Sequence, residues 1–143
     1  MKVKDLLRHN SKEVITITPA ASLGDAMELL VKHRISCLPV VDNESGVVGI
    51  ISDRDIFREA FDDHLNYRDT SVGERMTTEV IIGVLEDEIS YIAGIMTNNR
   101  IRHVPIVEEN KLIGLVSTGD VVKTQMDKLQ TENRYLRQYI MQG

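Results

Sequence analysis

The sequence has few of the features that mark a disulfide-stabilised, membrane-bound or nucleic-acid-binding protein. Cys37 is the only cysteine, so an intramolecular disulfide is excluded and a reducing compartment, the cytoplasm, is the expected location. Nowhere do about eighteen apolar residues run together, so we expect neither a signal peptide nor a membrane span. The formal net charge is -5 and no strongly basic run occurs. This argues against nucleic-acid binding, because phosphate backbones are bound by clustered Lys and Arg.

Residues arranged for catalysis or metal binding are also missing. The four histidines show no metal-ligand spacing: His9, His33, His64 and His103. With a single thiol beside them, we predict no structural metal. Cys37 lies in an apolar run and has no placed base, which favours a packed core thiol over a nucleophile. No activated nucleophile or catalytic dyad can be assembled, so we predict that the protein is not an enzyme and needs no catalytic cofactor.

The chain does contain a seven-residue pattern that occurs twice. Residues 49–55 (GIISDRD) and 114–120 (GLVSTGD) carry Gly, two aliphatics, Ser and Asp at identical spacing. An aliphatic run leading into Ser-x-x-Asp indicates a strand followed by a helix N-terminus, where phosphate can bind. The same residues match a capping box, with Ser as the N-cap and the acid three residues later. The motif alone favours capping and leaves binding open.

The two motifs belong to a longer internal repeat. When Pro39 is aligned with Pro105, two apolar stripes coincide at the helical spacing i, i+3, i+4, i+7: Leu23, Ala26, Met27 and Leu30, and Ile89, Ile92, Ala93 and Met96. Each stripe predicts an amphipathic helix. Each helix is followed by two predicted strands around a polar turn, at 37–41 and 47–51 in the first copy and at 103–107 and 112–116 in the second. The Ser-x-x-Asp motif then opens a second helix.

The repeat extends upstream, because residues 3–7 resemble residues 72–76. Each leads to an aliphatic stretch, 14–19 or 80–85, that we predict to be a strand. The fold class is therefore α/β (α+β), with each unit running strand, helix, strand, strand, helix, and with the two units burying their helix faces against each other. We divide the chain into repeat 1 with its linker (1–66), repeat 2 (67–124) and a C-terminal amphipathic helix (125–143).

Over about residues 1–124 the chain resembles a tandem pair of cystathionine β-synthase (CBS) domains, a Bateman module, of the stand-alone bacterial or archaeal type. The marks are Pro19, "RISCLPVVD" at 34–42, "RIRHVPIVE" at 100–108 and the two Gly-to-Asp endings. The resemblance implies two β-α-β-β-α repeats in a pseudo-twofold arrangement. It also implies a regulatory module that binds AMP, ADP or ATP, or else NAD or S-adenosylmethionine, in clefts between the repeats and signals to an effector protein. The alternative is a dimerisation or interaction module that uses Ser-x-x-Asp only as caps.

The resemblance assigns roles to the two motifs. Asp55 and Asp120 would hold ribose hydroxyls, and Ser52 and Ser117 would touch phosphate, in keeping with the acceptor and donor capacities of these groups. The family arranges its sites crosswise. The first motif would face Val80 and Ile81, and the second would face Val14, Ile15 and Thr16.

Basic residues just before the repeated proline often reach phosphate in this family. Arg102 and His103 occupy that place in repeat 2, whereas repeat 1 has Ser36 and Cys37. The two clefts are therefore expected to be unequal, and the cleft of Ser52 and Asp55 is the first in which we would look for ligand.

Beyond repeat 2, apolar residues follow heptad spacing. The seam consists of Val122, Met126, Leu129, Asn133, Leu136 and Ile140. A short coiled coil would place Asn133 at an a position and Glu132 and Arg137 at g and e, where they can pair between parallel helices. The stripe could instead pack on the protein's own surface. Because the family commonly pairs two modules, we expect a homodimer.

Overall fold

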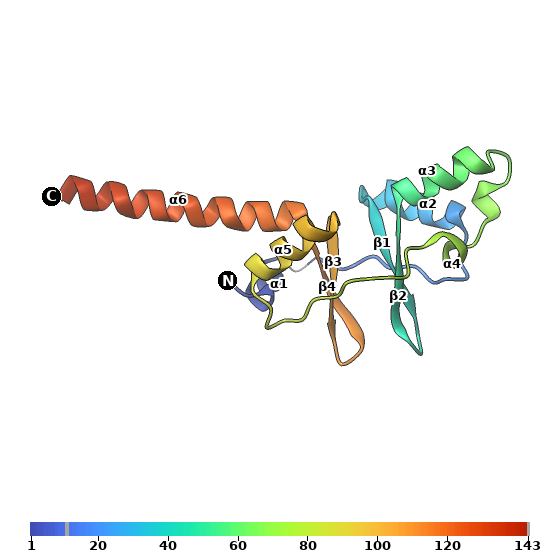
Figure 1. Ribbon diagram of the computed structural model, residues 1–143, viewed down its shortest axis with the longest axis horizontal. Coiled ribbons are helices and arrows are strands. Elements are labelled where there is room, and N and C mark those ends of the chain that lie inside the picture. Colours follow the sequence, from blue (N-terminus) through green and yellow to red (C-terminus); the bar gives the residue numbers. More distant parts are fainter. Residues whose placement is uncertain (11, 143) are drawn as a thin grey trace.

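The computed structural model describes residues 1–10 and 12–142, which form two halves and a long helix that leads away from one of them (Figure 1). One hairpin consists of β1 (Cys37–Asp42) and β2 (Gly46–Ser52), and the other of β3 (His103–Glu108) and β4 (Lys111–Ser117). The helices are α1 (Val3–His9), α2 (Leu23–His33), α3 (Asp53–Asp62), α4 (Val72–Arg75), α5 (Ile89–Asn99) and α6 (Thr118–Gln142), with a 3-10 turn at Tyr67–Asp69. β2 contacts β4 where the halves meet.

The internal repeat is confirmed down to details of the backbone. Both hairpins are antiparallel, and both shift register at the equivalent place, after Val40 in one and after Ile106 in the other. Helices α2 and α5 both end on an arginine in the left-handed region, with φ of 53° at Arg34 and 54° at Arg100. The predicted α+β architecture with two equivalent units is therefore correct.

The two opening stretches, 14–19 and 80–85, are not the strands that the sequence predicted. Each makes a single parallel bridge to its hairpin, Ile17 to Val40 and Gly83 to Ile106. The Ile17 N–H donates to the Pro39 carbonyl (3.1 Å), and the Val41 N–H donates to the Ile17 carbonyl (2.8 Å). The next ladder bond would need a donor at residue 39, and proline has no N–H. Pro105 ends the equivalent ladder in the same way.

Each half has its own core, which corrects the expectation that the units bury their helix faces against each other. The first core consists of Ile17, Leu23, Ala26, Leu30, Leu38, Val40, Ile51, Ile56 and Val72. The second consists of Val3, Leu6, Ile89, Ile92, Met96, Val104, Ile106, Val116 and Val121. The predicted helix stripes are thus buried, but each covers the hairpin of its own half.

The cores also show that the halves exchange short helices. Val3 and Leu6 of α1, at the start of the chain, are buried in the second half, whereas Val72 of α4 is buried in the first half. Figure 1 shows the same exchange, with α1 beside α5 and α4 beside α2 and α3. The two packing units therefore do not coincide with the stretches on either side of the predicted boundary at residue 66.

The motif glycines give room to the exchanged helix α1 and to the residues that follow α4. A Cβ on Gly49 would lie 2.5 Å from the Met76 sulfur and 2.9 Å from the Thr77 carbonyl oxygen, and a Cβ on Gly114 would lie 2.7 Å from Leu7. Such separations are too short for carbon, so these two positions require glycine for close approach. The repeated glycine is explained by packing without a ligand.

The C-terminal helix is one continuous element with the helix that follows the second motif. α6 runs from Thr118 to Gln142, and Val121 in its first turn is buried in the second core. The rest projects from the body (Figure 1). The apolar seam is exposed, so the alternative that it packs on the protein's own surface is wrong. Among the described residues no helix combines the length and apolarity needed to cross a membrane.

Candidate functional site

Both Ser-x-x-Asp motifs form capping boxes at the starts of helices. The Asp55 N–H donates to Ser52 Oγ (3.2 Å), and the Ser52 N–H donates to Asp55 Oδ2 (2.9 Å). In the second motif the Asp120 N–H donates to Ser117 Oγ (3.1 Å), and the Ser117 N–H donates to Asp120 Oδ2 (2.9 Å). The capping interpretation is therefore confirmed at α3 and α6.

Both motifs keep groups that could bind a ligand while they cap their helices, and the second motif keeps one more such group than the first. Each cap uses only the Oδ2 atom of its aspartate, and a carboxylate can accept further hydrogen bonds at Oδ1. The Ser52 hydroxyl donates to Asp55 Oδ2 (2.9 Å), which occupies its proton. Ser117 makes no such bond within the part of the chain that the structure describes, so its hydroxyl proton remains available to a ligand.

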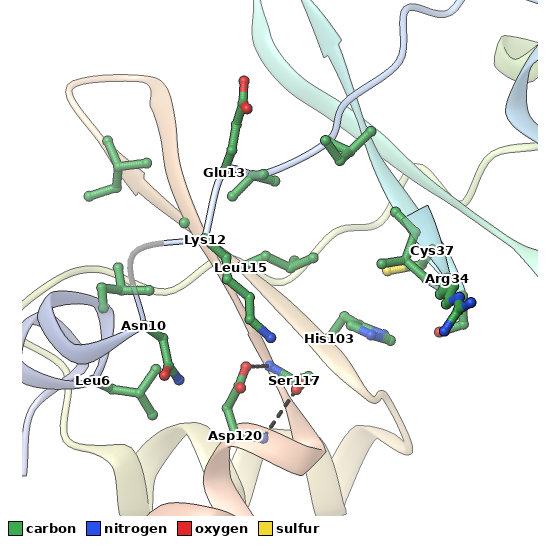
Figure 2. Close-up of a pocket in the computed structure, with 17 residues that line it drawn as sticks. Leu6, Asn10, Lys12, Glu13, Arg34, Cys37, His103, Leu115, Ser117 and Asp120 are labelled. Atoms are coloured by element: carbon green, nitrogen blue, oxygen red, sulfur yellow. Dashed lines mark hydrogen bonds between the residues drawn. The ribbon is translucent and has the colours of Figure 1, made fainter. Parts of the chain in front are cut away.

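A cavity of about 630 Å³ lies between the halves at the second motif (Figure 2). Its walls come from four segments: the end of α1 with residues 12–15, the segment 34–37 that leads into β1, His103 of β3, and the end of β4 with the start of α6. Because β1 belongs to the first half and β4 to the second, the cavity requires both repeats. Its volume is in the range of small-molecule sites.

Five of the residues that the sequence singled out lie around this cavity: Val14, Ile15, His103, Ser117 and Asp120. The second motif thus faces the first opening stretch, in the crosswise relation that the family resemblance implies. Thr16 lies in the wall of a neighbouring hollow of about 610 Å³. Val80 and Ile81 are not brought to this cavity, nor are Ser52 and Asp55.

Arg102 and His103 are adjacent in the chain but line different hollows. His103 lines the cavity of the second motif, whereas Arg102 lines a shallow hollow of about 350 Å³ with Asp53, Arg54 and Phe57. Neither Ser52 nor Asp55 lines the hollow of Arg102, although Asp53 beside them does. A role for Arg102 at the cleft of Ser52 and Asp55 therefore stays a prediction, whereas His103 lines the cavity of the other motif. The larger and more enclosed space is at Ser117 and Asp120.

Two cations in the cavity wall, Lys12 and Arg34, were not identified from the sequence. Figure 2 shows the Lys12 side chain pointing toward Ser117 and Asp120, whereas Glu13 points away from them. Arg34 comes from the end of α2, and its left-handed backbone turns the chain into β1. The repeated Arg-Ile dipeptide at 34–35 and 100–101 was a signal that could have identified Arg34. Lys12 had no such pattern.

Two titratable groups in the cavity wall, His103 and Cys37, are neutral at pH 7. Burial, followed by the nearby Arg102 charge, lowers the pKa of His103 below its ordinary value, although Asp120 and Asp53 oppose that shift. Burial, followed by the Asp53 charge, raises the pKa of the Cys37 thiol to about 12. His103 can therefore both donate and accept a hydrogen bond. Cys37 is a buried thiol, as predicted, and its thiolate is too scarce for nucleophilic chemistry.

The cavity thus combines an apolar wall with a few polar groups that can orient a ligand. Asp120 Oδ1 and the Ser117 hydroxyl lie close together at the start of α6, and Lys12 and Arg34 supply positive charge. No group of three or more His, Cys, Asp or Glu side chains that could hold a metal occurs within residues 1–10 and 12–142. The arrangement is suited to binding a small polar molecule.

Comparison with known proteins gives concordant matches. The family model of the CBS domain matches residues 3–62 and 72–127. CBSX3, a mitochondrial CBS domain-containing protein of Arabidopsis thaliana, is 30% identical over 99% of this chain and 72% of its own length. The CBS-domain protein ATU1752 of Agrobacterium tumefaciens has a TM-score of 0.81 and 34% identity, covering 87% of this chain and 99% of its own.

Two similar structures contain adenosine compounds. The CBS domain pair of MJ0100, in complex with 5'-methylthioadenosine and S-adenosylmethionine, has a TM-score of 0.77 and 31% identity over 90% of this chain and 98% of its own. CBSX2 in complex with AMP has a TM-score of 0.74 and 28% identity over 88% of this chain and 96% of its own. With two matched domains that together span most of its length, the chain belongs to the CBS domain family and carries a CBS domain pair.

Proposed function

We propose that this protein is a non-enzymatic regulatory module that binds an adenosine-containing nucleotide, AMP in the first place, in the cavity of Ser117 and Asp120. One observation carries the proposal: the second motif faces Val14 and Ile15 across a cavity of about 630 Å³ while keeping acceptor and donor capacity beyond its capping bonds. The AMP complex of CBSX2 and the 5'-methylthioadenosine and S-adenosylmethionine complexes of MJ0100 support an adenosine ligand.

The proposed roles follow from the chemistry of the cavity wall. Asp120 Oδ1 accepts from the ribose diol, and the apolar side chains of Val14 and Ile15 cover the adenine ring. The Ser117 hydroxyl donates to phosphate at the N-terminus of α6, where the helix dipole favours an anion. Lys12 and Arg34 neutralise the phosphate charge. The same cations disfavour the positively charged sulfonium of S-adenosylmethionine, so AMP, ADP or ATP should bind better than it does, with NAD as a further candidate.

The biological role that we propose is signalling by a homodimer to an effector protein. Ligand in a cavity built from both halves would change how the halves sit against each other, and a partner would detect that change. A reducing compartment such as the cytoplasm suits a chain whose single cysteine, Cys37, is buried as a free thiol.

The direct test is a calorimetric and thermal-shift titration of the full chain with AMP, ATP, NAD and S-adenosylmethionine. AMP at a hundredfold excess over its Kd should raise the free energy of unfolding by about 2.7 kcal/mol. If a folded sample binds none of the four, the nucleotide proposal fails.

The second candidate is an interaction module that binds no nucleotide, and the exposed seam of α6 is the observation that favours it. In that case Asp120→Asn and Asp55→Asn would change stability alone, and truncation after Lys123 would change the oligomeric state. Any saturable shift with AMP that Asp120→Asn removes would contradict this candidate.

A further inference from the structure

We infer that the projecting part of α6, residues 122–142, forms a parallel two-stranded coiled coil with α6 of a second copy of this chain. The inference specifies the homodimer of the proposed function. It does not depend on nucleotide binding.

The seam of α6 has no partner within the chain. Its apolar members are between 47% and 73% exposed: Val122, Met126, Leu129, Leu136 and Ile140. A single helix of this length has little stability in water when only its first turn is packed. Burial of the seam therefore needs a surface outside the described residues of this copy.

The body lies on the opposite, polar face of α6. Seven residues of α6 line a hollow together with Met1, Leu6, His9 and Asn10 of the N-terminal segment: Asp120, Lys123, Thr124, Asp127, Lys128, Thr131 and Glu132. None of these α6 residues occupies an a or d position of the heptad, although Glu132 is at g, beside the seam. The seam consequently faces away from the body and is free to meet another molecule.

The heptad identifies that molecule as a second copy in parallel orientation. In a parallel, in-register pair Asn133 meets Asn133 of the other copy, and their amides can hydrogen-bond to each other. In an antiparallel pair the a layer faces d residues, so Asn133 would be buried against leucine with its amide unsatisfied, which costs about 1–3 kcal/mol. The seam therefore selects the parallel arrangement.

Flanking charges support the same arrangement. Glu132 at g lies opposite Arg137 at e of the other helix, and twofold symmetry repeats this attraction on both sides. Gln125 at g would meet Gln130 at e in the preceding heptad, where neither side chain is charged. The parallel register therefore contains two attractive charge pairs and no repulsive one at these positions.

The geometry also links the dimer to the proposed ligand cavity. Asp120 caps the same continuous helix whose seam begins at Val122. A parallel pair would hold the two cavities at one end of the assembly, both next to the base of the coiled coil.

Cysteine cross-linking in the full chain tests the inference. Asn133→Cys places a thiol at the a layer, Gln138→Cys places one at the outward f position of the same helix, and native Cys37 is buried. Under mild oxidation Asn133→Cys should form covalent dimers at least tenfold faster than Gln138→Cys. Equal rates, or no cross-link at Asn133→Cys, would overturn the inference even if the bodies dimerise by other surfaces.

A charge-matched pair of double variants gives the second readout. Leu129→Glu with Leu136→Glu should weaken self-association in sedimentation equilibrium at least tenfold, whereas Thr131→Glu with Gln138→Glu, at two f positions, should leave it nearly unchanged. A wild-type chain that is monomeric and instead binds phosphatidylcholine vesicles through the seam would also overturn the inference. AMP titration of the Leu129 and Leu136 variant separates the two proposals, since the cavity should still bind when the coiled coil is lost.

Discussion

The two halves of the molecule share a backbone plan, but they use the same Ser-x-x-Asp motif in different surroundings. At Ser52 the hydroxyl proton is held by Asp55, and the nearby hollow that Arg102 lines is shallow. At Ser117 the hydroxyl accepts the capping bond but its proton has no acceptor among the described residues, and a cavity of about 630 Å³ opens beside it. The motif itself therefore makes a helix cap in both halves. The segments that face it decide where a ligand can bind.

The halves also differ in how they hold the helix that each receives in exchange. In the first half the Glu59 side chain, only 7% exposed, forms an ion pair with Arg75 and accepts a hydrogen bond from Thr70 Oγ1 (3.2 Å). When residues 3–7 are aligned with 72–76, Leu6 takes the place of Arg75, and it is buried in the second core. Both helices bury an apolar residue, Val72 in α4 and Val3 in α1, but only α4 adds an ion pair to a buried carboxylate.

The largest expected effect concerns Leu6, which packs α1 into the second core. Leu6→Ala should lower the free energy of unfolding by about 3 kcal/mol, because it leaves a cavity in the second core although the residue lies near the start of the chain. Chemical denaturation measures the change. Leu65→Ala, at an 80% exposed leucine, is the control and should change stability by less than about 0.5 kcal/mol. Equal effects at both sites would mean that α1 is not part of the second half.

The ion pair of the first half should have the next largest effect. Arg75→Ala leaves the Glu59 carboxylate buried without its cation and should cost about 2 kcal/mol in unfolding free energy. Lys4→Ala removes one partner of the exposed Glu86 pair (3.0 Å) and should lower stability far less, because solvent screens the pair. Adding Glu59→Gln to Arg75→Ala should recover part of the loss. No recovery would show that Arg75 acts through packing alone.

A variant of Lys12 can show whether the cavity recognises the phosphate charge of AMP or only the shape of the nucleoside. Lys12→Met should weaken AMP binding about tenfold, because a charge-assisted contact to phosphate contributes roughly 1.5 kcal/mol. Binding of 5'-methylthioadenosine, which has no phosphate, should stay within about twofold. Calorimetry with the two ligands gives the comparison, and Lys128→Met, at a lysine that does not line this cavity, is the control. Parallel losses for both ligands would contradict a phosphate role for Lys12.

The smallest expected effect is the pH dependence caused by His103. Its folded-state pKa lies below that of the unfolded chain, so the unfolded state binds the proton more readily. Stability is therefore fully present above about pH 6.5 and falls as the pH is lowered through the folded-state pKa. Denaturation of the wild type and His103→Asn between about pH 7.5 and 5 should show a smaller acid loss in the variant. Parallel curves would show that His103 does not contribute.

The parts of the fold that the sequence predicted correctly are local in origin. The hairpins, the amphipathic helices and both capping boxes follow from spacing over a few residues. The prediction of strands at 14–19 and 80–85 was wrong because Pro39 and Pro105, on the strands that these stretches meet, lack the N–H donors that a longer ladder needs. The exchange of α1 and α4 was missed because any apolar helix face can in principle cover either hairpin, and only three-dimensional packing decides between them.

The candidate site likewise contains residues that local sequence patterns identify and residues that they do not. Ser117 and Asp120 were identifiable because a repeated motif contains them, and Val14 and Ile15 because the family resemblance sets them opposite that motif. Lys12 lies in a polar segment without periodicity, so nothing local points to its role. The sequence pairs Arg102 with His103, and only the structure shows that these two adjacent residues line different hollows.

The most direct test of the central claim is the affinity for AMP of two matched variants, Asp120→Asn and Asp55→Asn, measured by calorimetry. Asparagine retains a side-chain oxygen for the cap, so both variants should fold, which circular dichroism can verify. We predict that Asp120→Asn weakens AMP binding at least tenfold while Asp55→Asn changes it less than threefold. An equal loss in both variants, or a loss confined to Asp55→Asn, would contradict the assignment of the ligand to the cavity of Ser117 and Asp120.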